Sequence, residues 1–254
     1  MDLISDIERA LVKQRRKRIS KEIYQRFNGV IQDGIFKGLK LSRDTNTSAG
    51  VLGSKVLGFY ENVVSEFVIK QGPYSNVINL GSADGYFAIG MLVKNLSSKA
   101  ICFEISEKGR ASIRENAEEN NCSSRIQIYG KADHEFYKKV SPEINDTENN
   151  LIICDIEGGE FDFISSDIFQ KFKNCTWVIE LHDKVKNRPK GIREKFLARI
   201  PKDLNYEIIK SKPIIWPEIE LLEDLSDNDR ALLFSEGRKK IGEWLTIMPN
   251  KKDF

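Results

Sequence analysis

The hydrophobic pattern of the chain predicts strands that alternate with helices. Residues 77–80 form a short apolar run, as expected of a strand that is buried on both faces. Small residues fill positions 81–85, and apolar residues return over 87–92 as expected of a helix. Further apolar runs predict strands at residues 99–105, 125–129, 151–156, 176–181, 206–209 and 244–248. This alternation predicts an α/β fold whose doubly wound sheet is mostly parallel and has an antiparallel edge.

Amphipathic segments predict helices around this sheet. They are expected at residues 2–34, 55–70 and 107–121, with an ordered loop or short hairpin over 35–55. We therefore divide the chain into an N-terminal helical extension with its loop, residues 1–54, and a main domain, residues 55–254. Residues 213–243 of the main domain are acidic and partly helical, and they can form a lid over a substrate.

The first predicted helix carries two apolar faces and one basic run. One face carries Ile4, Ile7 and Leu11, and the other carries Ile19, Ile23, Phe27 and Val30. Between them, residues 13–18 read KQRRKR. This run can contact RNA or an acidic membrane, or it can be a solvated helix face, and we favour the solvated face because no aromatic platform accompanies it.

The turn at residues 81–85, GSADG, is the first candidate binding feature. A strand, a tight turn and a helix in this order point backbone N–H groups at a ligand, and glycine lets that ligand approach closely. The dinucleotide fingerprint requires glycine at 81, 83 and 86, but the chain has Gly81, Ala83 and Tyr86. The looser pattern G-x-G-x-G, typical of class I S-adenosylmethionine (SAM) methyltransferases, fits with one Gly-to-Ala change.

Two acidic residues extend the candidate site. Glu104 ends the second strand 19 residues after Gly85, where a carboxylate that binds a ribose diol is expected. Asp133 follows the third strand and can meet an adenine amino group. Asp133 can equally be an ordinary surface acid, and for Glu104 the less favoured alternative is an exposed acid at the end of a strand.

Composition excludes several other classes of protein. The net charge is only +2, so no global drive toward nucleic acid or membrane is expected. No apolar run approaches 18 residues, so no membrane span is expected. The four cysteines show no C-x-x-C spacing, which disfavours a structural zinc site and favours buried free thiols. Free thiols fit a reducing compartment, so we expect a cytoplasmic protein.

Acidic residues and a histidine follow two strands that are expected to be neighbours. They are Asp155, Glu157 and Glu160 after one strand, and Glu180, His182 and Asp183 at the end of the next. Three roles stay open. His182 or Asp155 can be a general base on a substrate hydroxyl. Asp155 can hold a divalent cation with Glu180, His182 or Asp183. The group can also be a hydrogen-bonded structural cluster.

Four motifs between residues 77 and 183 carry a family resemblance: NLGSADGYFAIG, FEI, CDIEGGEFDFI and WVIELHD. Together they resemble the FkbM-type branch of class I SAM-dependent methyltransferases. The resemblance implies a seven-stranded Rossmann-like sheet, with residues 55–254 as the methyltransferase domain. It also implies methyl transfer from SAM to an oxygen, often on a sugar or a polyketide-like acceptor.

The same resemblance assigns residues to the cofactor. Gly81, Ser82, Ala83 and Gly85 would face the methionine part of SAM. Glu104, with Ile105 beside it, would hold the ribose, and Asp155 and Glu157 would lie near the sulfonium and the acceptor. The chain departs from the family pattern at Asn79, where these enzymes often have Asp.

These features together predict O-methylation of a small-molecule or glycan hydroxyl, with SAM as cofactor. His182, Asp155 and Glu180 are the expected catalytic residues. A divalent cation is possible but not required, and nucleic acid is not expected as a partner. The alternatives are an RNA-directed methyltransferase anchored by the basic helix and a non-catalytic SAM-binding module.

Overall fold

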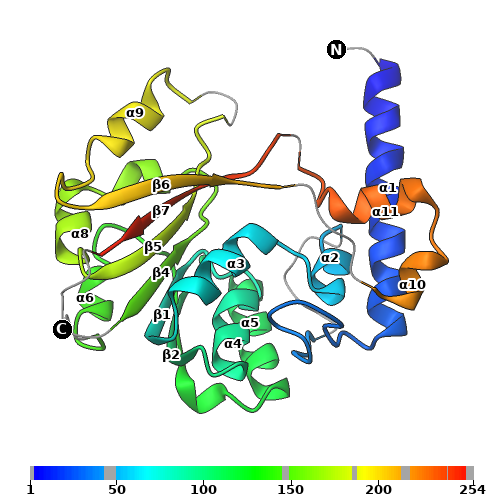
Figure 1. Cartoon of the computed structure of the whole chain (residues 1–254), viewed down its shortest axis with the longest axis horizontal. Helices are drawn as coiled ribbons and strands as arrows, with labels where there is room; N and C mark the ends of the chain where they lie inside the picture. The colour runs from blue at the N-terminus through cyan, green and yellow to red at the C-terminus, as the bar shows by residue number, and fades with distance from the viewer. Residues whose placement is uncertain are drawn as a thin grey trace.

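A computed structural model of the chain describes residues 3–42, 50–144, 149–184, 188–212, 218–238 and 240–249. Within these residues, seven strands form one sheet (Figure 1). They are β1 (Tyr74–Leu80), β2 (Ser97–Phe103), β3 (Ile126–Tyr129), β4 (Asn150–Cys154), β5 (Cys175–Glu180), β6 (Asn205–Lys210) and β7 (Glu243–Met248). Every strand lies at the position that the apolar runs predict.

The order of the strands creates a switch point in the middle of the sheet. The order is β3-β2-β1-β4-β5-β7-β6, with β7 antiparallel to both of its neighbours and the other pairs parallel. The predicted fold class is therefore confirmed. The chain order reverses between β1 and β4, and in such sheets ligands bind outside the carboxyl ends of the strands at that point.

Helices cover both faces of the sheet (Figure 1). On one face, the apolar core joins the sheet to α3 (Asn62–Gln71), α4 (Tyr86–Val93) and α5 (Glu107–Glu119). On the other face, it joins the sheet to α6 (Tyr137–Val140), α7 (Glu160–Phe163), α8 (Ser166–Lys171) and α9 (Ile192–Leu197). A single 3₁₀ turn, η1 (Ser123–Arg125), precedes β3. The side chains of a strand alternate between these two cores, since successive residues point to opposite faces.

A third apolar cluster joins the N-terminal helices to residues 219–234 beside the sheet. It is built from α1 (Leu3–Arg26), α2 (Leu52–Leu57), α10 (Glu220–Glu223) and α11 (Asp227–Phe234). Ile19 and Ile23 of α1 are buried in it, as the second predicted face requires. Arg15 adds a bidentate ion pair to Asp229 of α11, with N–O distances of 2.6 and 3.0 Å.

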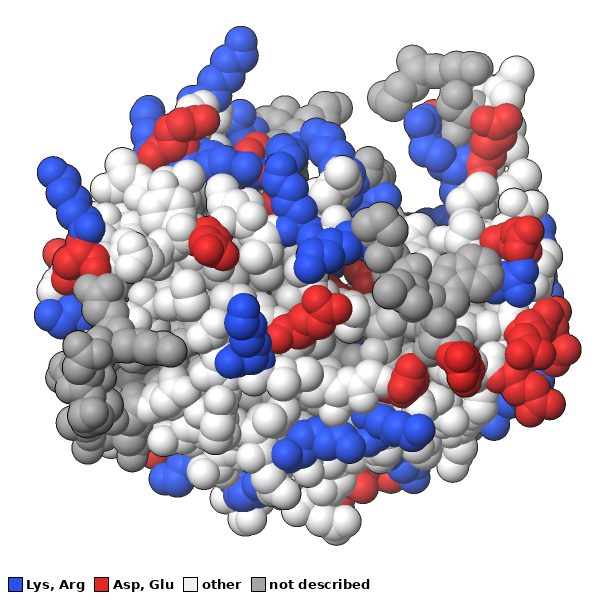
Figure 2. All heavy atoms as spheres, viewed as in Figure 1, with Lys and Arg blue, Asp and Glu red and all other residues white. Residues whose placement is uncertain are grey.

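The first helix is shorter than predicted, and its other apolar face is not buried. The predicted end at residue 34 is wrong, because Asn28 and Gly29 adopt positive φ angles that stop α1 at Arg26. Ile4, Ile7 and Leu11 are exposed on the half of α1 that extends beyond the body (Figure 1). Basic and acidic side chains are interspersed on the face shown in Figure 2.

The single helix predicted over residues 55–70 is also wrong. The chain forms α2, breaks at Gly58, and resumes as α3. Gly58 has a φ of +89°, and a Cβ there would lie 1.9 Å from the carbonyl oxygen of Asp33. The loop before α2 therefore forces the break, and the apolar period alone cannot reveal it.

Two expectations from composition can be compared with the fold. All four cysteines are buried and free, so they behave as small apolar residues as predicted. Among the described residues, no helix is long and apolar enough to cross a bilayer. Residues 213–217 and 239, which belong to the predicted lid, lie outside the described residues, and the lid itself stays a prediction.

The buried core predicts how much stability is lost when a side chain of a central strand is truncated. Ile152 of β4 is 0 % exposed, whereas Ile69 of α3 is 48 % exposed. Ile152→Ala should lower the free energy of unfolding by about 2–5 kcal/mol, because a cavity replaces buried apolar contacts. Ile69→Ala is the matched control and should change it by less than about 0.5 kcal/mol. Urea unfolding measures both, and equal effects would contradict this account of the core.

Candidate active site

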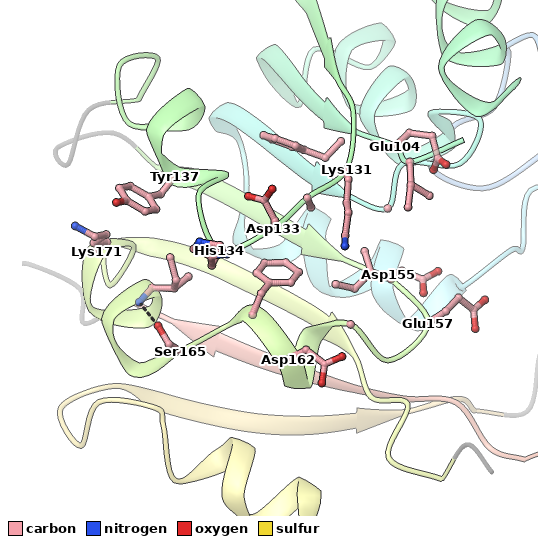
Figure 3. Close-up of a pocket in the computed structure, with 18 of the residues that line it drawn as sticks. Glu104, Lys131, Asp133, His134, Tyr137, Asp155, Glu157, Asp162, Ser165 and Lys171 are labelled. Atoms are coloured by element: carbon pink, nitrogen blue, oxygen red, sulfur yellow. Dashed lines mark hydrogen bonds between the residues drawn. The ribbon is translucent and has the colours of Figure 1, made fainter. Parts of the chain in front are cut away.

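A large cavity of about 910 Å³ opens at the carboxyl ends of β1, β2, β3 and β4 (Figure 3). Seven residues predicted to bind the cofactor line it: Gly81, Ala83, Glu104, Ile105, Asp133, Asp155 and Glu157. Figure 3 shows Asp155 and Glu157 together at one end of the cavity and Tyr137 and Lys171 at the other. The residues predicted at four different strand ends therefore lie around one cavity.

Two further spaces adjoin this large cavity. A narrow pocket of about 40 Å³ is lined by Asn79 and Ser82 among others, and a second cavity of about 750 Å³ is lined by Glu180 and His182. Asp155 lines all three spaces. Gly85 is not among the lining residues of any of them, so its predicted contact with a cofactor has no support in the geometry.

The turn after β1 is shaped by the protein rather than by space for a ligand. Gly81 has a φ of +81°, and a Cβ there would lie 1.7 Å from the carbonyl oxygen of Asp155. Glycine is therefore required because the ends of β1 and β4 touch. Gly81 also lines the large cavity and the narrow pocket, so the expectation that it allows close approach of a ligand stays a prediction.

The backbone N–H groups of the turn are also largely occupied. Those of Gly81 and Ser82 both donate to the carbonyl oxygen of Phe103 at the end of β2. The N–H of Ala83 donates to Glu104 Oε2 at 2.8 Å, and that of Gly85 donates to the carbonyl oxygen of Ser82. The expectation that these groups point at a ligand is therefore wrong for the four residues.

Glu104 links the turn to the neighbouring strand end. Its Oε1 accepts the N–H of Ser106 at 2.7 Å, while its Oε2 accepts the N–H of Ala83. A carboxylate has about four acceptor positions, so each oxygen keeps one for another donor. Glu104 is thus fixed in place with acceptors left for a diol, as the ribose assignment requires.

Arg238 organises the acids on the other side of Asp155. It follows α11, and its guanidinium binds Glu61 at 2.7 Å, Glu180 at 2.6 Å and Glu236 at 2.9 Å. Its guanidinium carbon also lies 4.9 Å from the ring centre of Trp244. One cation therefore holds three carboxylates from α3's N-terminal cap, β5 and the turn after α11.

Glu160 orients His182. It is fully buried, and its Oε1 lies 3.1 Å from His182 Nδ1 and accepts the backbone N–H of the same residue at 3.0 Å. Its Oε2 accepts the N–H of Gly158. The other ring nitrogen, Nε2, lies 3.6 Å from Asp155, 3.8 Å from Glu157 and 3.9 Å from Glu180. Nε2 therefore faces the second cavity among carboxylates.

Burial and charge shift the protonation of this group. Burial, followed by repulsion from Glu180, raises the pKa of Asp155 to about 8. Burial opposes the charged form of His182, but the hydrogen bond to Glu160 and the nearby carboxylates raise its pKa to about 9. Burial and Glu180 raise the pKa of Glu61 as well, while Arg238 acts in the opposite direction. These shifts favour the charged form of His182 and the neutral form of Asp155 relative to the free side chains.

Four further residues belong to this site. Glu61, Glu236 and Arg238 line the second cavity, and Lys131 points into the large one (Figure 3). Lys131 follows a predicted strand, so its position was accessible to the argument that selected Asp133. Glu236 and Arg238 belong to residues 213–243, the segment predicted to form a lid over a substrate, whereas Glu61 lies outside the predicted strand ends and nothing local marks it.

The acids form two groups that could bind a divalent cation, and the two groups differ in the partners that already contact them. Ligand atoms of Asp155, Glu157 and His182 lie within 4.8 Å of one another, and so do those of Glu61, Asp155 and Glu180. However, Arg238 already pairs with Glu61 and Glu180, and Glu160 holds His182. A cation at Glu61, Asp155 and Glu180 would have to displace Arg238, whereas the contact of Glu160 with Nδ1 leaves His182 Nε2 facing Asp155 and Glu157.

The same spaces fit SAM better. Asp155 Oδ1 is buried and accepts no hydrogen bond from any residue that the structure describes, so a polar acceptor faces the junction of the three spaces. Glu104 supplies acceptors for a diol, and apolar Ile105, Ile156 and Phe163 line the remaining wall of the large cavity. A cationic centre with an adenosine group matches both features.

Known proteins are similar to this chain in fold. No protein-family model matches the sequence, and no curated protein matches it. The O-methyltransferase from Bacillus cereus in complex with SAH is 13 % identical, with a TM-score of 0.47 over 75 % of this chain and 79 % of that chain. The cofactor-bound protein Rv0187 from MTB is 10 % identical, with a TM-score of 0.48 over 86 % of this chain and 87 % of that chain.

A third similar structure acts on a different class of acceptor. The tRNA methyltransferase TrmK from B. subtilis is 15 % identical, with a TM-score of 0.42 over 74 % of this chain and 66 % of that chain. Similarity at this level assigns no role to a residue and no acceptor to the chain.

The raised pKa of Asp155 predicts how stability depends on pH. Between about pH 4 and pH 8 the unfolded chain releases this proton while the folded protein keeps it, so stability falls as the pH rises. Asp155→Asn removes that loss. Thermal melting should give the variant a higher melting temperature than the wild type near pH 8, and the same temperature near pH 4.

A second acid of the large cavity serves as the control. Glu157 is 88 % exposed, and Glu157→Gln should leave the melting temperature unchanged at both pH values. If Asp155→Asn and the wild type melt together near pH 8, Asp155 is not held in its neutral form by burial.

Proposed function

We propose that this chain is a SAM-dependent methyltransferase of the FkbM type that methylates a hydroxyl oxygen of a small molecule or glycan. One observation carries the proposal: Asp155 lines the large cavity, the narrow pocket and the second cavity at once. A cofactor in the large cavity and an acceptor in the second cavity would therefore meet beside this carboxyl group. Methyl transfer requires such a meeting of two bound molecules.

The large cavity would hold the adenosine part of the cofactor. Glu104 would bind the ribose hydroxyls and Asp133 the adenine amino group, while Ile105 would cover the base. Asn79, Ser82 and Ala83 would line the methionine end. When bound, SAM supplies a methyl group that is already activated by the sulfonium charge.

The residues of the second cavity would prepare the acceptor. Asp155, Glu157 and Glu180 offer acceptors for hydroxyl hydrogen bonds and so would orient a hydroxyl group. Holding two reactants in line can supply about 7–11 kcal/mol of the acceleration. His182 Nε2 would take the hydroxyl proton, and Glu160 would keep the ring in position for this step.

The cofactor assignment is tested by ligand-induced stabilisation. A ligand at 100 times its dissociation constant stabilises the folded protein by about 2.7 kcal/mol. In a chain of this size SAM should therefore raise the melting temperature by roughly 5–10 °C. NAD at the same concentration should not shift it. A shift with NAD and none with SAM would overturn the proposal.

The role of His182 is tested by rate and pH together. Transfer from radiolabelled SAM is first measured with a panel of sugars, polyols, catechol and bulk tRNA, and tRNA as the best acceptor would contradict the proposed hydroxyl class. With the best acceptor, His182→Gln should lower the rate by about 10²–10⁴-fold while the SAM dissociation constant stays nearly unchanged.

The pH profile separates this role from a structural one. Because the pKa of His182 is raised to about 9, the wild-type rate should rise between pH 7 and pH 9 as Nε2 loses its proton. The residual rate of His182→Gln should lack this rise. Loss of SAM binding in the variant, measured by isothermal titration, would show that His182 supports the fold of the site instead.

A further inference from the structure

We propose that Lys55 binds the carboxylate at the amino-acid end of the cofactor, a role that rests on the proposed function. Lys55 lies on α2 and lines the narrow pocket. Its side chain is buried, 3 % exposed, which is rare for a lysine that has no task other than solubility.

Asp84 fixes Lys55 without using all of its donors. Lys55 Nζ lies 2.9 Å from each carboxylate oxygen of Asp84, a residue that is only 1 % exposed. The rings of Tyr60 and Tyr86 flank the ammonium, with their centres 5.0 and 5.1 Å from Nζ. An ammonium has three N–H donors, so two point at Asp84 and one remains. The ion pair therefore presents a positioned cation to the pocket.

The narrow pocket has the size of a small charged group. A cavity needs roughly 10–15 Å³ to hold one water, so 40 Å³ gives room for about three water-sized atoms. A carboxylate has three heavy atoms. The pocket shares Gly81, Ala83 and Asp155 with the large cavity, so a group attached to a ligand there can reach it.

Most backbone donors of the turn after β1 are already taken. The N–H groups of Gly81, Ser82, Ala83 and Gly85 all donate within the protein, and so does that of Tyr86, whose acceptor is Asp84 Oδ1. Among the residues that line the narrow pocket, Lys55 is the one with a lysine or arginine side chain. A carboxylate entering this pocket therefore finds its charge partner in Lys55, while Glu61 and Asp155 on the same pocket lining suit the neighbouring ammonium.

Isothermal titration with S-adenosylhomocysteine and with its decarboxylated analogue tests the contact. Loss of a hydrogen bond to a charged group should make the analogue bind the wild type about 10–100-fold more weakly. Lys55→Met keeps the length of the side chain and removes the charge. This variant should bind both ligands with nearly equal affinity, because the carboxylate then has no partner to lose.

A second variant removes the orphaned charge that Lys55→Met creates. Breaking a buried ion pair on one side is strongly destabilising, whereas the pair Lys55→Met with Asp84→Asn leaves no unpaired charge. The double variant should likewise bind S-adenosylhomocysteine and its decarboxylated analogue with nearly equal affinity. Lys131→Met is the matched control, since Lys131 lines the large cavity away from the narrow pocket, and it should keep the wild-type ratio.

The outcomes separate this inference from the proposed function. If the wild type binds S-adenosylhomocysteine but does not distinguish its decarboxylated analogue, the role of Lys55 is wrong and the cofactor assignment stands. If the Lys55 variants keep the wild-type ratio, another residue binds the carboxylate. If the wild type binds neither S-adenosylhomocysteine nor SAM, both proposals fail. The wild-type comparison needs no variant to fold.

Discussion

The close contact between Gly81 and the backbone of Asp155 is the constraint on which the site depends. The N–H of Asp155 donates to the carbonyl oxygen of Leu80 at 2.9 Å, so the pairing of β1 and β4 continues to their ends. A Cβ at position 81 would lie 1.7 Å from the carbonyl oxygen of Asp155. The turn after β1 and the acidic segment after β4 are thereby locked together, and the three adjoining spaces meet at one carboxyl group.

The acids gathered at this point require cations to remain there. Asp155, Glu180 and Glu61 lie close enough to repel one another, and burial adds to the cost of their charges. Arg238 and the imidazolium of His182 offset this cost from two sides. The arrangement keeps protons at Asp155 and His182 that can move at slightly alkaline pH. A polar group in the second cavity would thus lie beside side chains that can gain or lose a proton near that pH.

The sequence predicts the large cavity better than the second cavity. Glu104, Asp133 and Asp155 each follow a strand, and the periodicity of the apolar runs locates strands well. Lys55, Glu61 and Arg238 belong to segments whose partners are far away in the chain: Arg238 reaches Glu61 across 177 positions. No local pattern reports such a contact. The boundary at residue 54 stays a prediction.

Two glycines that the sequence does not mark as constrained are fixed by the same kind of contact. Glycines at positions 58 and 81 look permissive, yet each is required because another stretch of backbone passes within 2 Å of where its Cβ would lie. The break at Gly58 separates Lys55 from Glu61 and turns both toward the narrow pocket, whereas an unbroken helix over 55–70 would hold them at fixed helical spacing. Long-range packing therefore sets the geometry of the narrow pocket.

The two halves of the site are consequently built in different ways. The large cavity opens at strand ends that the sheet itself holds in register. The second cavity depends on Arg238, whose turn follows α11 and reaches β5 through the side chain of Glu180. Substitutions in the turn at 235–238 can therefore reshape the second cavity and leave the large cavity intact. Because the charge of Arg238 also balances Glu180, such changes would alter the protonation of the site as well as its shape.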